Sequence, residues 1–166
     1  MNQLKIHEVE DGLVGHLKAA LPAMDRQIAS LTNGDFNAGG DVIVTDLPAI
    51  RVFYRTGPLA RGAGRMNDST ALTYDAALGF VVLCGASNMR SRAEERKDAL
   101  ELVDDVLDAL AGKRLEGLPS YQMSRGPQVV LQNAGELFQF GPDGTWYAVP
   151  VVVEGITQYE RNAAAA

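Results

Sequence analysis

Residues 80–112 read FVVLCGASNMRSRAEERKDALELVDDVLDALAG and decide the fold, because they predict a strand, a polar turn and a long helix in direct succession. The first five residues form a continuous apolar run between Gly79 and Gly85. Such a run is typical of a strand that is buried on both faces. The sequence therefore predicts a central strand at residues 80–84.

The helix that follows is predicted to begin near Arg92. Ser91 stands three residues before Glu94, which is the spacing of a capping box, in which the two side chains bond free backbone N–H groups. Apolar residues then recur at steps of three and four, so one helical face is expected to lie in the core. These residues are Ala99, Leu102, Val103, Val106, Leu107 and Leu110. Gly112 predicts the end of the helix, because glycine readily adopts the left-handed conformation.

An earlier helix is predicted over residues 3–20 from apolar positions at helical spacing, and Pro22 disfavours helical geometry at the residue before it. Residues 23–32 fit either a helical turn or an extended piece. Residues 49–55 alternate as a half-buried strand does, with Ile50 on the inner face and Arg51 on a face that meets solvent or another chain.

The remaining strands complete the predicted fold. Residues 72–86 are expected to form one long strand with a bend at Gly79, and the last third of the chain is expected to hold strands at 129–131, 136–140 and 145–156. Pro150 lacks an N–H and predicts an edge or bulge in the final strand. We therefore expect one domain over residues 1–166, with a short C-terminal tail. Its predicted fold is α+β, a mixed, mainly antiparallel sheet flanked by two main helices.

Two glycine-rich segments are predicted to be loops. Residues 33–41 read NGDFNAGGD, but a calcium loop also needs a glutamate at its twelfth position, and no glutamate lies between Asp11 and Glu94. Residues 57–69 read GPLARGAGRMNDS and predict a long mobile loop that becomes ordered on assembly, with Arg61 and Arg65 available to a neighbouring molecule. This segment lacks the Lys-Ser of a phosphate-binding P-loop.

Composition excludes several classes of protein. The 166 residues are 46% hydrophobic with a formal charge of −6, and they contain one cysteine and two histidines. One cysteine cannot form an internal disulfide, and His7 and His16 lie far from other soft ligands, so we expect no metal and no cofactor. The negative charge argues against a general nucleic-acid binder, although it leaves room for a local basic patch, and we expect no sequence-specific nucleic acid binding. The sequence has no apolar run that predicts a membrane span or a secretory leader, so we expect residence in the cytoplasm.

Cys84 is the one candidate nucleophile, since it stands at the end of a strand. A nucleophile elbow has glycines two positions before and after the reactive residue, whereas Cys84 lies within an apolar run. We therefore expect a buried packing group and no enzyme activity. A small cysteine-dependent hydrolase is the alternative from another functional class.

The order of charges on the long helix is unusual. Arg90, Arg92, Arg96 and Lys97 lie near its start, and Asp104, Asp105 and Asp108 lie near its end. Both clusters oppose the helix dipole, partly offset by Glu94 and Glu95. The pattern predicts a head-to-tail ring, in which the basic start of one helix meets the acidic end of the next. Ordinary solvated surface charge is the alternative.

Four short motifs give the chain a resemblance to a known family. They are LKAALP at 17–22, LPAIRV at 47–52, SNMR at 87–90 and DALAG at 108–112. Together with the layout of residues 6–156, they resemble the small Mu-type phage tail proteins, which are similar to the lambda-type tail terminators. The glycine-rich segment at 57–69 has no counterpart that we can match.

This resemblance implies a tail-terminator-like fold and a structural role in the virion. The family assembles into a hexameric ring that caps the tail tube and presents a surface to the head, so the implied partners are other copies, the tube, the sheath and the head-tail connector. Assembly would take place in the host cytoplasm. The family contributes no catalytic residues. A head-tail connector or neck protein and a ligand-binding regulatory domain are further alternatives.

Overall fold

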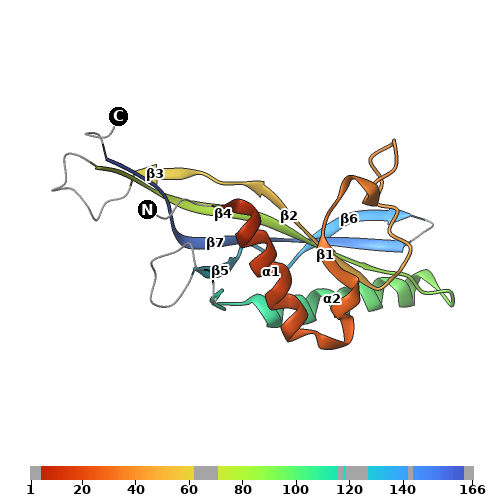
Figure 1. The fold of residues 1–166 in the computed structure, drawn as a ribbon. Coiled ribbons are helices and arrows are strands. Elements are labelled where there is room, and N and C mark those ends of the chain that lie inside the picture. The colour runs from red at the N-terminus through yellow and green to blue at the C-terminus, as the bar shows by residue number, and fades with distance from the viewer. Residues whose placement is uncertain (1–4, 62–70, 116–117, 119–126, 142–143, 163–166) are drawn as a thin grey trace.

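The computed structural model describes residues 5–61, 71–115, 118, 127–141 and 144–162 (Figure 1). Among these residues the elements follow in this order: α1 (Ile6–Ala20), the 3₁₀ turn η1 (Pro22–Gln27), β1 (Ile28–Ser30), the 3₁₀ turn η2 (Asn33–Asp35), β2 (Ala49–Thr56), β3 (Leu59–Arg61), β4 (Ala71–Ala86), α2 (Arg92–Leu110), β5 (Gln128–Leu131), β6 (Glu136–Gly141) and β7 (Gly144–Asn162).

The strands form one seven-stranded sheet in the order β1-β2-β4-β7-β5, with β3 paired to β4 and β6 paired to β7. Every pairing is antiparallel except that of β1 with β2. The predicted α+β fold with a mixed, mainly antiparallel sheet is therefore confirmed.

Strands β4 and β7 form the centre of the sheet. They pair from Ala71 opposite Asn162 to Ala86 opposite Thr145, and their far ends extend beyond the helices in Figure 1. Val82 and Leu83 have no exposed surface, so the predicted central strand is buried on both faces. Pairing of β4 with β2 shifts register opposite Gly79, where the sequence predicts a bend.

Both α-helices pack on the same face of the sheet (Figure 1). Leu13 of α1 and Val106 of α2 are fully buried, and the same core contains Val82 and Val149 from the two central strands. Neither helix of the described residues is long and apolar enough to cross a membrane.

Helix α2 begins at Arg92, as the sequence predicts. The Ser91 hydroxyl oxygen accepts a hydrogen bond from the N–H of Glu94 at 3.1 Å, which satisfies one of the free donors of the first turn. Gly112 lies beyond the end of the helix with φ of +64°, in the left-handed conformation that glycine favours. Helix α1 begins at Ile6, and residues 3 and 4 of the helix predicted over 3–20 lie outside the described residues.

A segment between β1 and β2 covers part of the opposite face of the sheet. Val42 and the ring of Trp146 are buried there together with Val81 and Leu83. The side chain of Gln139 on β6 holds this segment in place, because its Oε1 accepts from the N–H of Val42 at 2.7 Å and its Nε2 donates to the carbonyl oxygen of Val42 at 3.1 Å.

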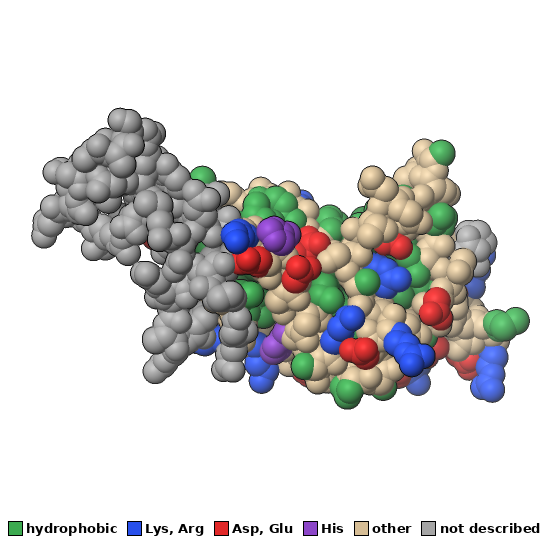
Figure 2. Space-filling view, viewed as in Figure 1, with side chains coloured by type: hydrophobic (Ala, Val, Ile, Leu, Met, Phe, Trp, Pro, Cys, Tyr) green, Lys and Arg blue, Asp and Glu red, His purple; other side chains and the backbone are tan. Residues whose placement is uncertain are grey.

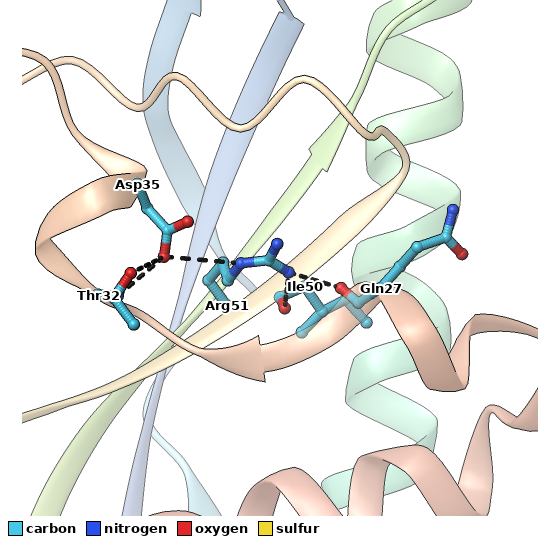
Figure 3. Close-up of polar contacts among 5 residues, drawn as sticks. All are labelled: Gln27, Thr32, Asp35, Ile50 and Arg51. Atoms are coloured by element: carbon cyan, nitrogen blue, oxygen red, sulfur yellow. Dashed lines mark hydrogen bonds and ion pairs between the residues drawn. The ribbon is translucent and has the colours of Figure 1, made fainter.

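The expectation that Arg51 meets solvent or another chain is wrong, because the same segment covers it. Arg51 Nη1 donates to the carbonyl oxygens of Gln27 at 2.7 Å and Ile50 at 3.1 Å, and Nε lies 3.7 Å from Asp35 Oδ2 (Figure 3). Asp35 also accepts from the N–H of Thr32 at 2.8 Å. Arg51 therefore ties η1 and η2 to β2 within the chain.

Pro150 marks neither an edge nor a bulge in the pairing of β7 with β4, which corrects the sequence prediction. It lies in β7, an interior strand, opposite Val81 of β4. Its carbonyl oxygen accepts from the N–H of Gln132 at 3.2 Å on the other side. On that side β6 pairs as far as Ala148 and β5 pairs from Val151 onward, so the missing N–H of Pro150 faces the gap between two short strands and removes no ladder bond.

The segment 57–69 is not wholly a loop, which is a third correction. Leu59–Arg61 forms β3 and pairs with β4 opposite Ala76, Asp75 and Tyr74. The pairing arises because β2 ends at Thr56 opposite Gly79, whereas β4 continues and offers its backbone groups to another strand. Residues 62–69 lie outside the described residues.

Candidate interaction surface

The basic side chains at the start of α2 lie beside β6 and β7. The guanidinium carbon of Arg92 stands 5.2 Å from the centre of the Phe140 ring, a cation–π arrangement. Arg96 Nε donates to the hydroxyl oxygen of Tyr147 at 3.3 Å. Lys97 pairs instead with Glu101 on α2 itself, at 3.7 Å and with both side chains exposed. Of the predicted basic cluster, Arg92 and Arg96 therefore project toward the sheet.

Strand β6 carries an exposed apolar surface beside these arginines, which we call the β6 patch: Leu137, Phe138 and Phe140, with exposed fractions of 56%, 45% and 50%. Leu137 stands opposite Tyr147 and Phe140 opposite Thr145, so both lie on the sheet face that α2 covers. In the part of the chain that the structure describes, β6 pairs only with β7, which leaves its outer edge without a strand partner. Natural proteins protect such edges with charge or cover, and contiguous apolar exposure marks interaction sites.

The acidic end of α2 lies beside the end of α1. Asp104, Asp105 and Asp108 are exposed, and none of them forms a salt bridge with another described residue. Asp105 and Asp108 line an open pocket of about 550 Å³ between the two helices, which we call the acidic pocket. Its apolar lining comes from Ala19, Ala20, Leu21 and Ala109.

His16 and Lys113 complete the lining of the acidic pocket. His16 Nε2 donates to the carbonyl oxygen of Ala109 at 2.8 Å, so this histidine joins α1 to the last turns of α2. No basic residue lies in the last turn of α2, so the helix end remains acidic.

The structure does not bring the two predicted charge clusters together within one chain. They lie toward opposite ends of the 19-residue helix α2, and their centres are about 18 Å apart at the helical rise of 1.5 Å per residue. Of the predicted assembly loop, Arg61 lies in β3 by its backbone, and Arg65 lies outside the described residues. On the face seen in Figure 2, acidic and basic side chains are interspersed.

The candidate nucleophile is enclosed by the core. Cys84 has no exposed surface, and burial raises the pKa of its thiol well above the usual range, which disfavours the reactive thiolate. Within the described ranges, no group of three histidine, cysteine or acidic side chains is placed to bind a metal ion.

Glu95 is a buried carboxylate that the sequence pattern does not reveal. It is only 7% exposed, although it lies in the first turn of α2. Its Oε2 accepts from the buried hydroxyl of Thr145 at 2.7 Å, and its Oε1 accepts from the N–H of Asn88 at 3.4 Å. These bonds link α2 to β7 and to the preceding turn, which is a structural role.

The β6 patch is the candidate interaction feature that the sequence patterns did not reveal. Alternation correctly predicts a strand at 136–140, but it leaves open which of the aromatic side chains are covered. The available sequence signal was a pair of phenylalanines, Phe138 and Phe140, on one short strand. No protein-family model matches the chain, and no curated protein matches it in sequence.

Proposed function

We propose that this protein is a structural component of a phage tail, a tail terminator whose copies join head to tail in a closed ring. The single observation that carries the proposal is that the two ends of α2 carry different surfaces. The start of the helix, with its arginines, lies beside the exposed apolar strand β6, and the end of the helix lines an acidic pocket. The two ends complement each other and cannot meet within one chain.

Such a division favours a heterologous interface. When one surface of a copy binds a different surface of the next, rotation either closes a ring or produces a filament. Opposite charges at the two surfaces set the orientation of the contact and disfavour start-to-start pairing. The motif resemblance suggests six copies, which would be enough to encircle a tail tube.

The ring would cap the tube, stop its growth and present its other side to the head. Its partners would be other copies, the tube and sheath proteins and the head-tail connector, all within the virion and assembled in the host cytoplasm. The extended ends of β4 and β7, which project beyond the helices in Figure 1, are suited to contacts outside the ring plane.

A head-tail connector, or neck protein, is the nearest second function, because it would use a ring interface of the same kind. The hydrolase alternative receives less support, since Cys84 is enclosed and its thiol is held protonated.

Electron microscopy of the purified protein mixed with polymerised tail tubes tests the proposal. We expect rings of uniform size at the tube ends and an arrest of tube elongation when unpolymerised tube protein is then added. Bovine serum albumin at the same concentration serves as the control. Rings that bind the portal end of heads and ignore tubes would indicate a connector, and a monomer that binds neither would contradict the proposal.

A further inference from the structure

We infer that the β6 patch of one copy docks into the acidic pocket of the next, with Phe140 as the buried anchor and Arg92 as its cationic companion. The inference rests on the proposed ring and specifies the contact that closes it.

The β6 patch has the composition of an interface centre. Phe140 exposes 50% of its surface although its ring already lies under a guanidinium group, so it is held in place but only half covered. Aromatic and arginine side chains dominate binding energy at protein interfaces when they enter a desolvated pocket. Arg92 has no salt bridge with any other described residue, so its charge is available to a carboxylate of a partner.

The acidic pocket offers apolar space for Phe140 and carboxylates for Arg92. Its volume of about 550 Å³ exceeds that of one aromatic side chain, and its small apolar residues leave room for a ring. Asp105 and Asp108 at its wall can then accept from the guanidinium group of Arg92. The charges of the two surfaces are opposite in sign, and both surfaces contain exposed apolar area.

A second copy is the occupant that the geometry favours. Each copy carries both surfaces at opposite ends of α2, so every copy can donate a patch and receive one. Pairing of patch with patch would instead bring Arg92 against Arg92. Only the head-to-tail arrangement buries the apolar surface and pairs the charges together.

Thiol cross-linking tests this contact. In one variant Leu137→Cys marks the patch while keeping Phe140 and Arg92, and in another Ala19→Cys marks the pocket. The native Cys84 is buried and stays unreactive. After brief treatment with a short bis-maleimide, we expect a mixture of the two single variants to give covalent dimers and no larger species, and the double variant to give a ladder up to the full ring.

Matched controls separate this contact from random collision. Each single variant alone should remain monomeric on a denaturing gel, and Leu137→Cys combined with Ala60→Cys, an exposed residue of β3, should give no ladder. Cross-linking of Leu137→Cys alone would show patch against patch and would overturn the inference.

A binding measurement gives an independent readout. Phe140→Ala should weaken self-association on the order of 30-fold, as expected for an interface anchor, whereas Val130→Ala, an apolar residue of β5 that is 37% exposed, should leave it unchanged. Rings that form normally without cross-links and tolerate Phe140→Ala would refute the inference while leaving the proposed ring intact. Absence of any assembly in the wild type would refute both.

Discussion

Gly85 shows how tightly single residues are constrained in the sheet. A Cβ atom at this position would lie 2.5 Å from the ring of Trp146, which is 1% exposed and fully packed. Real Cβ atoms do not approach so closely, so a side chain at Gly85 requires the ring to move. Glycine is needed at position 85 because the Trp146 ring lies too close to leave room for a Cβ atom.

We expect Gly85→Ala to lower the free energy of unfolding by about 1–3 kcal/mol, as overpacking of a dense core does. Gly15→Ala is the matched control, because a Cβ at Gly15 of α1 meets nothing within 4 Å. That change should raise the free energy of unfolding by about 0.5–1 kcal/mol through helix propensity. Urea unfolding followed by circular dichroism measures both, and equal effects of the two changes would contradict the described packing.

Cys84→Ala should lower the free energy of unfolding by about 1–2 kcal/mol, since it removes one small buried group. Assembly of the folded variant should be unchanged. In the wild type, an aromatic disulfide reagent should react with the thiol only after denaturation, because the residue has no exposed surface. Rapid reaction of the native protein, or a folded variant that no longer assembles, would revive a functional role for this cysteine.

Arg51 helps to hold in place the segment between β1 and β2, which covers part of the second face of the sheet. We expect Arg51→Met to lower the free energy of unfolding by about 1–3 kcal/mol, because it removes charge-assisted bonds to Gln27 and Asp35 while keeping an apolar stem. Amide hydrogen exchange should accelerate across residues 31–44.

Arg55→Met provides the control for this prediction. Arg55 lies on the same strand, but it is exposed, so the substitution should change the free energy of unfolding by less than about 0.5 kcal/mol. If both variants exchange amides at the wild-type rate, the covering segment is held by its apolar contacts alone.

The elements that sequence predicts correctly are those fixed by local patterns. The central strand and α2 follow from an apolar run, a serine cap and a three-to-four spacing, all of which act over a few residues. The predictions that failed concern Arg51, Pro150 and β3. They failed because the surroundings of these residues come from distant segments. Alternation of apolar and polar residues assigns a residue to one face of a strand. What covers that face is decided by segments that are distant in the sequence.

The same limit applies to the candidate site. The two charge clusters of α2 are visible in the sequence because they lie on one helix. The β6 patch and the acidic pocket are not, since each combines elements that are far apart in the chain, such as Arg92 with Phe140 and His16 with Ala109. Exposure of an aromatic side chain is a property of the folded molecule.

At the scale of the whole molecule, the ring should be sensitive to ionic strength. Exposed charge pairs are screened within about 10 Å at 0.1 M salt and within about 3 Å at 1 M salt. We therefore expect rising salt to shift the assembly toward the monomer while the circular dichroism spectrum stays constant. An assembly that strengthens steadily with salt would indicate a purely apolar contact.

Sedimentation velocity on three forms of the protein tests the head-to-tail ring most directly. The forms are the wild type, the variant Asp105→Lys with Asp108→Lys, and the variant that adds Arg90→Glu and Arg92→Glu. These side chains are exposed, so each subunit should stay folded. We expect a ring for the wild type, a monomer for the reversed acidic end, and recovery of the ring when both ends are reversed. A reversed acidic end that sediments as the wild-type ring does would contradict the head-to-tail arrangement.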